Sequence, residues 1–544
     1  ELITKHKYPT LKQAFIDIHQ PKELINAEQA RLRLTFDEAL LLQLLLGQRR
    51  AEIVKLSTKN RTPNTPVLVK AFEDRLPFKY TAGQQLVNEE IAKDLSNKYP
   101  MHRLLQGEVG SGKTVVALRA MLSVVDSGGQ AALLAPTEVL AQQHFRTIKK
   151  LLGELAELGT LQSGEIATSI ELLTGSMSAA TKRAIHARLA SGEIGIVIGT
   201  HALMSDGVEF EDLGLVVVDE QHRFGVEQRD ALRMKAKQPP HLLVMTATPI
   251  PRTVAMTVFG DLDISTLREL PGGRAPIQTH LIPVLEKPHY LDRAWERVRE
   301  EVGKGHQVYI VAPRIVNPDK KLTEREMHAA QMLGEEFLDN QNMTAVEELA
   351  PDLATGALKG LKIAMLHGRQ SSDEKEQTMT AFASGAIDVL VATTVIEVGV
   401  DVPNASMMVI MDAERFGVSQ LHQLRGRVGR GGVPGLCLLV TAAPEQTPSM
   451  ERLIAVSQTL DGFELARIDL EQRKEGDVLG SSQSGGKSHL RLLRVLRDED
   501  LIESAREDAL GLLKSDPTLS KHLQLLSEVE KLKDQESSAF MDKS

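Results

Sequence analysis

The sequence predicts an α/β protein with two doubly wound parallel sheets in tandem, a helical segment before them and a helical region after them. Two observations predict this class. Short runs of continuously apolar residues alternate with helical patterns, as expected for parallel strands buried on both faces. This rhythm runs once, stops at the break Pro271–Gly273 and then starts again. A rhythm that occurs twice is typical of two doubly wound domains.

The apolar runs locate the expected strands. In the first series they are Arg103–Gln106, Ala131–Ala135, Ile194–Ile198, Leu213–Val218 and His241–Met245. In the second series they are Val308–Ala312, Ile363–Leu366, Val389–Ala392, Met407–Met411 and Leu436–Thr441. The two series share no visible sequence repeat, so we expect the same architecture twice without internal sequence similarity.

Four regions follow from this pattern. We expect a helical connector at 1–60, a first α/β domain at 61–265, a second α/β domain at 266–450, and a helical hairpin with C-terminal helices at 451–544. Within the connector, Leu34–Arg50 is rich in leucine and helix-forming residues. Prolines mark 60–66 as a linker, and glycines and serines mark Gly476–Ser488 as a loop.

Composition excludes several classes of protein. The net charge of −9 and an isoelectric point near 6.0 argue against a generally basic DNA-coating protein, although a local basic groove is compatible with them. The single cysteine, Cys437, lies in an apolar run; it excludes an intramolecular disulfide and fits a reducing compartment. No run approaches the roughly 18 apolar residues of a membrane span. We therefore expect a cytoplasmic protein without a membrane partner, supplied as a fragment that begins at Glu1.

A phosphate-binding loop is predicted at Gly107–Thr114, with the sequence Gly-Glu-Val-Gly-Ser-Gly-Lys-Thr. It follows a predicted strand and opens a helical pattern at Val115–Val125, which is the context that such a loop requires. The candidate nucleotide ligands are Gly107, Gly110, Ser111, Gly112, Lys113 and Thr114. Their backbone N–H groups would surround the phosphates, the lysine would contact the β- and γ-phosphates of ATP, and the threonine would hold Mg²⁺. The alternative, a Gly-rich turn with an exposed lysine, does not explain this order of strand, loop and helix.

A pair of carboxylates at the end of another predicted strand completes a hydrolytic site. Asp219 and Glu220 directly follow the run Leu213–Val218, and ligand chemistry in doubly wound folds gathers at the carboxyl ends of strands. We expect Asp219 to orient Mg²⁺ and Glu220 to polarise the attacking water. Alone, such a pair would more often be a surface helix cap.

The second half carries an arginine-rich motif that a lone phosphate loop lacks. Gln423 begins the segment Gln-Leu-Arg-Gly-Arg-Val-Gly-Arg, which ends at Arg430. Arg427 and Arg430 can reach across a cleft to the γ-phosphate and stabilise charge in the transition state. The catalytic residues predicted from the sequence are therefore Lys113, Asp219, Glu220, Gln423, Arg427 and Arg430.

With these motifs in place, the chain resembles the superfamily 2 helicases, which are built on two RecA-like domains. The resemblance implies that Phe78 and Gln84 read the adenine, and that Gly399 and Asp401 lie on the nucleotide side. It assigns a second set of residues to the nucleic-acid track or to its coupling with hydrolysis: Pro136, Thr137, Gly175, Thr200, His201, Thr246, Thr248, Thr393 and Thr394.

Three extensions are similar to the RecG family of branched-DNA translocases. They are the residues that follow Asp219 as far as Val226, the run Thr248–Thr253, and the phosphate loop Gly107–Thr114. The C-terminal region adds to this resemblance with Gly462–Leu470, followed by Arg473 and Gln483. The resemblance implies that this region belongs to a hairpin and loop that move duplex DNA. Here Lys474 and Glu475 stand where the family has glycine and proline.

The resemblance implies an ATP- and Mg²⁺-dependent translocase on double-stranded and branched DNA, in recombination and DNA repair. It implies a nucleoid-associated monomer with single-stranded DNA-binding protein as a further partner. RecG proteins carry an N-terminal wedge domain, but no five-stranded pattern precedes Leu76. We therefore expect a chain that begins at the helical connector. Alternatives are an RNA helicase, a transcription-repair coupling factor-like translocase, a nucleotide-gated junction scaffold and a small-molecule kinase.

Overall fold

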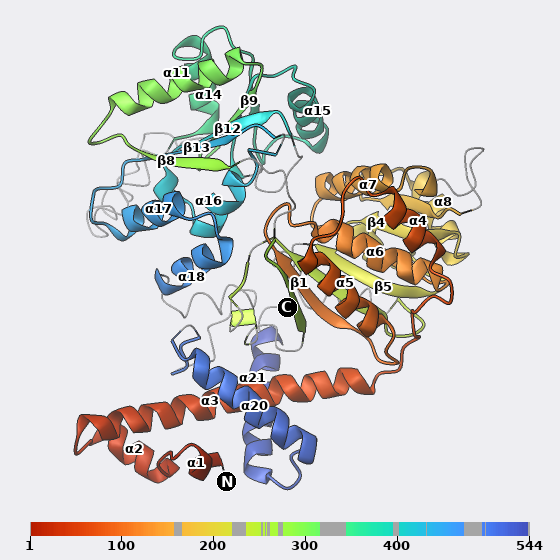
Figure 1. The fold of residues 1–544 in the computed structure, drawn as a ribbon, viewed down its shortest axis with the longest axis vertical. Helices are drawn as coiled ribbons and strands as arrows, with labels where there is room; N and C mark the ends of the chain where they lie inside the picture. Colours follow the sequence, from red (N-terminus) through yellow and green to blue (C-terminus); the bar gives the residue numbers. More distant parts are fainter. Residues whose placement is uncertain are drawn as a thin grey trace.

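The computed structural model of this chain contains two parallel sheets and a helical base (Figure 1). It describes residues 2–156, 166–219, 235–247, 249–251, 254–255, 257, 262–269, 276–315, 344–394, 402–430, 432–472, 492–495 and 497–541. We call the first sheet with its helices the first lobe and the second sheet with its helices the second lobe.

Seven parallel strands form the sheet of the first lobe, in the order β3-β4-β2-β5-β6-β1-β7. Their bounds are β1 His102–Gly107, β2 Gln130–Leu134, β3 Ser169–Leu173, β4 Ile194–Gly199, β5 Leu213–Asp219, β6 His241–Thr246 and β7 Asp263–Leu267. All five strands predicted from apolar runs are present. The sequence did not reveal β3 and β7, which are the two edge strands and are less apolar than the central ones.

Helices cover both faces of this sheet. They are α4 Val67–Arg75, α5 Ala82–Leu95, α6 Lys113–Asp126, α7 Glu138–Leu152 and α8 Ala179–Ala190, with the 3-10 helices η1 Gly153–Ala156 and η2 His201–Met204. Helices α4 to α7 share a core cluster with Ala131 and Leu133 of β2, whereas α8 and η2 share another with Ala132 and Leu134. Because side chains alternate along a strand, these clusters lie on opposite faces.

The second lobe repeats this architecture with six parallel strands in the order β10-β11-β9-β12-β13-β8. The strands are β8 Ile277–Pro283, β9 Gln307–Val311, β10 Ile363–Leu366, β11 Val389–Ala392, β12 Ala405–Ile410 and β13 Gly435–Thr441. Helices α11 His289–Gly303 and α14 Val346–Thr355 share one core cluster, and α15 Ser372–Ala383, α16 Val418–Arg425, α17 Pro448–Gln458 and α18 Gly462–Gln472 share the other. The two RecA-like sheets predicted from the sequence are thus confirmed.

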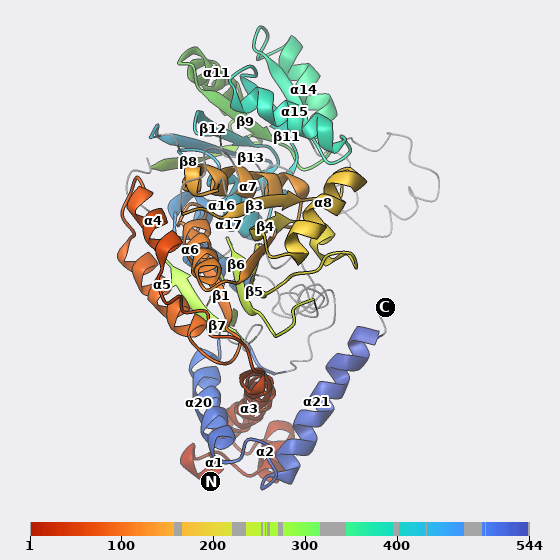
Figure 2. The same cartoon turned by 90° about the vertical axis from the view of Figure 1, so that its right-hand side faces the viewer.

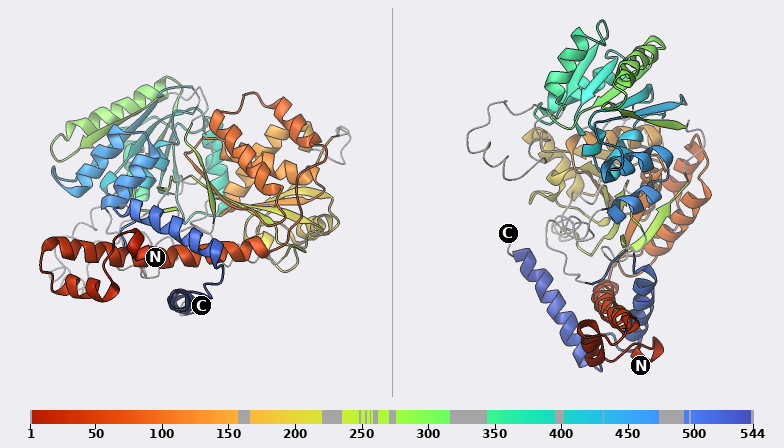
Figure 3. Two further views of the ribbon diagram at one scale, coloured as in Figure 1. Left: turned by 60° about the horizontal axis from the view of Figure 1, so that its bottom comes forward. Right: turned by 90° about the vertical axis from the view of Figure 1, so that its left-hand side faces the viewer.

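The helical base joins the two ends of the chain. Near the N-terminus are α1 Leu2–Lys5, α2 Leu11–His19 and the 32-residue α3 Leu24–Lys55; near the C-terminus are α20 Glu499–Ser515 and α21 Leu523–Met541. Helix α20 lies across α3, and α21 flanks α3 on another side (Figures 2 and 3). Between Leu2 and Lys55 the described elements are all helices, and the bounds 1–60 of the connector stay a prediction.

The segment after α3, predicted to be a linker, is docked on the first lobe. Thr58 Oγ1 donates to the carbonyl oxygen of Pro239 at 2.6 Å. Arg61 is only 3% exposed and its guanidinium binds both carboxylate oxygens of Asp212, at 2.9 and 2.6 Å. Prolines and threonines therefore mark an irregular segment here, but the buried arginine fixes it along the sheet.

Candidate nucleotide and nucleic-acid site

The phosphate loop lies between β1 and α6, and its shape depends on glycine. Gly110 and Gly112 each have a φ of 87°, a left-handed region that residues with a Cβ rarely adopt. A Cβ on Gly107 would lie 2.7 Å from Ser111 Oγ, so this position has no room for a side chain. The loop therefore turns tightly into the N-terminus of α6, where its N–H groups can receive an anion.

Lys113 and Thr114 occupy the first turn of α6. Lys113 Nζ donates to the carbonyl oxygens of Gly107 at 2.7 Å and of Glu108 at 2.9 Å. The ammonium thus lies folded against the loop that would hold the phosphates. Thr114 follows directly in the same helical turn, with a half-buried side chain.

Gln84, the predicted adenine reader, connects α5 to the phosphate loop. Its side chain is 2% exposed; Nε2 donates to the Ser111 carbonyl oxygen at 2.8 Å, and Oε1 accepts the N–H of Thr81 at 3.0 Å. Phe78 is 42% exposed, so its ring is accessible to a ligand. In this structure the side chain of Gln84 therefore supports the phosphate loop, and its contact with the adenine stays a prediction.

Asp219 ends β5 and is held by a residue that the sequence did not single out. Its Oδ2 lies 2.7 Å from Nε2 of His144 on α7, and both side chains are largely buried. This hydrogen bond fixes the direction of the carboxylate at the carboxyl edge of the sheet. The two residues are 75 positions apart, so only the packing of α7 on the sheet could reveal the pair.

The order of strands sorts the predicted residues of the first lobe into two groups. Strands β3, β4 and β2 are neighbours, and their carboxyl ends lead into the predicted track residues Gly175, Thr200, His201, Pro136 and Thr137. Strands β5, β6 and β1 are the next three neighbours. They end at Asp219, Thr246 and the phosphate loop. The predicted nucleotide residues and these five predicted track residues therefore share one edge of the sheet but lie in separate halves of it. Thr246, predicted to lie on the track or to couple it with hydrolysis, ends β6 between the two predicted nucleotide strands.

The predicted track residues carry local hydrogen bonds of strand-end turns. Thr137 caps α7 by accepting the N–H of Leu140 at 3.3 Å. Glu138 binds the N–H and hydroxyl of Ser176 at 3.0 and 2.7 Å, which ties the turn after β3 to the start of α7. Lys182 Nζ donates to the carbonyl oxygen of Gly175 at 2.5 Å. This part of the edge thus carries hydroxyl groups and a cation, which suit phosphate contacts, together with the carboxylate of Glu138 that binds Ser176.

In the second lobe, α16 and the residues after it face the phosphate loop. Gln423 is 5% exposed within α16, and Arg430 Nε donates to the carbonyl oxygen of Gly426 at 2.9 Å. A Cβ on Gly426 would lie 3.7 Å from Cβ of Val109 in the phosphate loop. The segment that carries Arg427 and Arg430 therefore begins in contact with the loop.

The remaining predicted track residues of the second lobe lie at adjacent strand ends. Thr393 and Thr394 follow β11, whose neighbour β10 leads into His367. The N–H of Thr393 donates to the carbonyl oxygen of Leu366 at 3.2 Å. Six predicted residues lie outside the described residues: Glu220, Thr248, Gly399, Asp401, Arg473 and Gln483.

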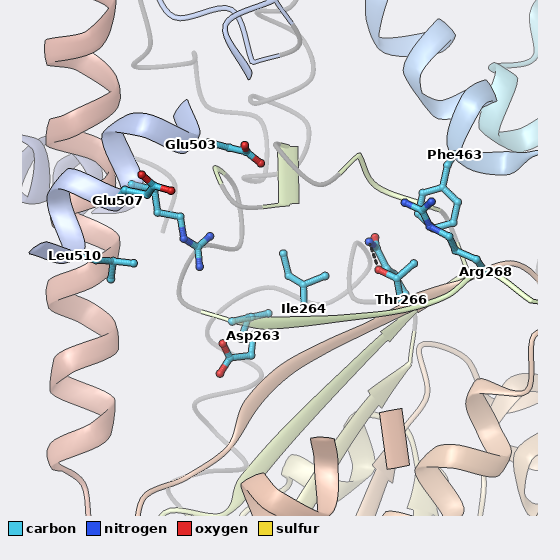
Figure 4. A pocket seen from close by; sticks show the side chains of 11 residues that line it. Asp263, Ile264, Thr266, Arg268, Phe463, Glu503, Glu507 and Leu510 are labelled. Carbon is cyan, nitrogen blue, oxygen red and sulfur yellow. Dashed lines mark hydrogen bonds between the residues drawn. The ribbon is translucent and has the colours of Figure 1, made fainter. Parts of the chain in front are cut away.

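A cleft of 660 Å³ lies where β7, α18 and α20 approach one another (Figure 4). Acidic Asp263, Glu503 and Glu507 line one part of it, and Phe463 lies with Arg268 at the other. The guanidinium carbon of Arg268 is 5.4 Å from the centre of the Phe463 ring, a cation–π geometry. Gln106, the residue directly before the phosphate loop, also lines this cleft, and the sequence did not predict the cleft.

Together the fold and the site define the class of the protein. Two parallel-sheet lobes, a phosphate loop in the first and an arginine-bearing segment against it from the second, are the parts of an ATP-hydrolysing helicase motor. The models of the DEAD/DEAH box helicase family and of the helicase conserved C-terminal domain match residues 81–257 and 293–432. Domain 3, C-terminal, of ATP-dependent DNA helicase RecG matches residues 459–536.

Curated relatives narrow the class to one family. The chain is 52% identical to an ATP-dependent DNA helicase RecG of Mycobacterium tuberculosis, over 96% of this chain and 69% of the relative. It is 42% identical to the protein of the same description from Bacillus subtilis, over 95% of this chain and 70% of the relative. The chain belongs to the RecG family of ATP-dependent DNA helicases, which confirms the resemblance stated from the sequence.

Solved structures agree with this assignment. The chain matches a structure of RecG bound to a three-way DNA junction with a TM-score of 0.67 and 37% identity, over 92% of this chain and 61% of that one. It therefore spans less than two thirds of that protein. The DEAD-box helicase Mss116 matches with a TM-score of 0.52 but 17% identity, and so supports the fold alone.

Proposed function

We propose that this chain is an ATP-driven translocase and helicase on double-stranded and branched DNA, such as stalled forks and four-way junctions, in recombination and DNA repair. The observation that carries this proposal is the contact between the phosphate loop and the α16 segment across the two lobes. ATP hydrolysis at a contact between two lobes can change the position of one lobe relative to the other, and so the way both bind DNA. The junction-bound RecG structure supports the choice of branched DNA.

In the proposed cycle, Lys113 contacts the β- and γ-phosphates, Arg427 and Arg430 approach the γ-phosphate from the second lobe, and Glu220 polarises the attacking water. Gln423 positions the segment that carries both arginines. The strand-end donors of both lobes grip the DNA backbone, which provides hold without sequence preference. Arg473 and Gln483 would then act on the duplex.

A Mg²⁺ ion fits the chemistry of the proposed site. Thr114 offers a hydroxyl oxygen and Asp219 a carboxylate that His144 already orients, and hard oxygen ligands are those that Mg²⁺ prefers. Oxygen atoms of the ATP phosphates would complete the coordination. Bound Mg²⁺ would neutralise charge on the phosphates.

The setting of the enzyme is a further part of this proposal. We propose a monomer that acts in the cytoplasm on nucleoid DNA, with single-stranded DNA-binding protein as an additional partner. In the part of the chain that the structure describes, no helix is long and apolar enough to cross a bilayer.

The test compares nucleic acids as activators of ATP hydrolysis. Rates would be measured with a three-way junction, linear duplex, single-stranded DNA and RNA at equal nucleotide concentration. We expect the junction and the duplex to stimulate hydrolysis most. RNA as the best activator would contradict the proposal and favour an RNA helicase. A chain that binds DNA junctions but whose ATP hydrolysis is not stimulated by DNA would instead be a junction-binding scaffold.

The first prediction concerns Lys113→Ala. Removing the ammonium takes away its contact with the phosphates, so kcat for ATP should fall by about 10²–10³-fold, a loss of roughly 3–4 kcal/mol of transition-state stabilisation. Junction binding in filter assays should be nearly unchanged. The control is Lys79→Ala, an exposed lysine near Gln84 in the sequence. A Lys113→Ala protein that still migrates branches would exclude ATP hydrolysis as the driving step.

A further inference from the structure

The first turn of α18 touches the first lobe at two points. The N–H of Gly462 donates to Glu108 Oε1 at 2.8 Å. One residue later, the ring of Phe463 packs against Arg268 (Figure 4). Glu108 and Arg268 directly follow β1 and β7, which pair in register to their last residues. The start of α18 is therefore held against the two strand ends beside the phosphate loop.

Glu108 completes the capping of α18. The N–H groups of Phe463 and Glu464 donate to Asp461 Oδ1 at 2.8 and 3.3 Å, which is an N-cap from the adjacent residue. The other amide of the first turn, that of Gly462, has its acceptor in Glu108. A helix N-terminus favours a carboxylate both as acceptor and through its dipole. The other lobe thus supplies one of the caps of this helix.

Gly462 is a position of close approach between the lobes. A Cβ there would lie 2.7 Å from His422 Nε2, 2.9 Å from Pro249 Cγ and 3.2 Å from Glu108 Oε1. Pro249 and Glu108 belong to the first lobe and His422 to the second. Glycine therefore allows α18 to contact both at once.

A chain of polar contacts continues from Glu108 into the second lobe. Glu108 Oε2 is 4.0 Å from Nε2 of His422, whose Nδ1 is 3.0 Å from Nη2 of Arg425. Arg425 is 2% exposed, and its Nη1 donates to the carbonyl oxygens of Val456 at 2.5 Å and Thr459 at 2.9 Å. Those carbonyls belong to the end of α17 and the turn before α18. The phosphate loop, α16 and the start of α18 therefore form one connected unit.

Lys113 connects this unit to the nucleotide. Its ammonium donates to the carbonyl oxygen of Glu108 at 2.9 Å, and the same ammonium is the proposed ligand of the β- and γ-phosphates. Binding phosphate would draw the ammonium from that carbonyl and alter the backbone that carries the Glu108 side chain.

We propose that Glu108 is a positioning residue that couples the phosphate loop to α18. A change in the loop on ATP binding and hydrolysis moves the Glu108 carboxylate and with it the first turn of α18. Helix α18 ends at Gln472, directly before the proposed translocation residue Arg473. The proposal rests on the proposed ATP-driven movement along DNA and names the contact that transmits it.

The test uses three variants of the full chain and one matched control. Glu108→Ala removes the acceptor, Glu108→Gln keeps an oxygen at the same reach, and Gly462→Ala inserts a Cβ between the lobes. The control is Gly511→Ala in α20, because a Cβ there would meet no atom within 4 Å. Both glycine-to-alanine changes raise helix propensity. If Gly462→Ala loses translocation and Gly511→Ala does not, the cause is therefore the position of Gly462 between the lobes.

Two measurements are made on each protein. The first is duplex translocation, as triplex displaced per ATP hydrolysed. The second is the change in hydrogen exchange of residues 462–472 when a non-hydrolysable ATP analogue is added, which needs no DNA. We expect Glu108→Ala and Gly462→Ala to lower displacement per ATP about tenfold and to lose the nucleotide-dependent change in exchange. Glu108→Gln should stay within about threefold of the unaltered chain, as expected if one hydrogen bond to a charged acceptor is weakened rather than lost.

Unchanged displacement per ATP and unchanged exchange in both Glu108→Ala and Gly462→Ala would overturn the proposal. So would a Glu108→Ala protein whose only defect is a raised KM for ATP, because Glu108 would then serve the loop alone. If DNA fails to stimulate even the unaltered chain, the proposed function is wrong. The exchange measurement still decides the coupling in that case, so the two failures can be told apart.

Discussion

His241 is a buried side chain whose protonation affects the stability of the folded chain. It is 0% exposed at the start of β6, and its Nδ1 accepts the N–H of Met101 at 3.0 Å. Burial lowers the pKa of His241 to about 4; the charge of Arg61 acts in the same direction, and the carbonyl of Lys59 opposes them. The neutral imidazole is therefore part of the first-lobe core, opposite the edge that carries the nucleotide residues.

The second prediction follows from that pKa. The unfolded chain binds a proton at His241 below a pKa of about 6.5, whereas the folded chain does so only near 4. The free energy of unfolding should therefore fall as the pH drops from about 6.5 to 4, by at most about 3 kcal/mol from this group. His241→Asn keeps a hydrogen-bond acceptor but removes the titrating imidazole. It should lower the thermal midpoint at pH 7.5, and the midpoint of this variant should depend less on pH. His19→Asn, at an exposed histidine, should keep the pH dependence of the unaltered chain; equal slopes in all three proteins would contradict the assignment.

The segment between α3 and α4 shows how one buried side chain positions a whole element. The guanidinium of Arg61 lies over two glycines: a Cβ on Gly129 would be 2.6 Å from its Nη1, and a Cβ on Gly214 would be 2.7 Å from its Nε. Asp212 holds the other side of the group. The helical base is therefore attached to the first lobe by a fixed strap rather than a free hinge.

The third prediction tests this strap. Arg61→Met should lower the stability of the first lobe by about 2–3 kcal/mol, because it leaves the partly buried Asp212 with Lys59 as its remaining ion-pair partner among the described residues. Asp212 is partly exposed, which keeps the loss below that of a fully buried pair. The measurement is the urea concentration at the midpoint of the unfolding transition of the first lobe. The double variant with Asp212→Asn should be less destabilised than the sum of both single changes; additive effects would show that the ion pair does not hold the strap.

At the scale of the whole molecule, the two ends of the chain are packed into one base. Asp508 of α20 binds Lys5 Nζ at 2.5 Å and His6 Nε2 at 2.6 Å. Burial acts to raise its pKa, but the hydrogen bonds from Lys5 and His6 outweigh it and hold the pKa of Asp508 below its usual value. On α3, Glu38 Oε2 accepts the N–H groups of Leu492 and Leu493 at 2.9 and 2.8 Å. Leu492 and Leu493 are thus fixed on α3.

The fourth prediction concerns this packing. Asp508→Asn should raise the hydrogen-exchange rate of residues 2–19 by roughly tenfold, since about 1–1.5 kcal/mol of charge-assisted hydrogen bonding is lost. ATP hydrolysis without DNA should not change, because the proposed ATP site lies on the first and second lobes and not in the helical base. Asp500→Asn, an exposed aspartate on the same helix, is the control. If both variants exchange alike, Asp508 does not anchor the N-terminal helices.

The sequence predicted what depends on local pattern. Central strands such as β2 and β5 were evident because both of their faces are buried and their residues form unbroken apolar runs apart from Gln130 at the start of β2 and Asp219 at the end of β5. Edge strands β3, β7 and β8 were missed because one side lacks a neighbour and polar residues are tolerated there. The phosphate loop was evident because strand, glycines, lysine and helix are contiguous.

The sequence by itself determined the fold class, the phosphate loop and the family, since these follow from residues close together along the chain. Only the tertiary structure decided which distant groups meet. It brought His144 to Asp219, docked Arg61 on Asp212, and joined Glu108 to Gly462, 354 residues away. Such contacts depend on how helices pack on sheets and how two lobes approach, and no local pattern of residues encodes that distance.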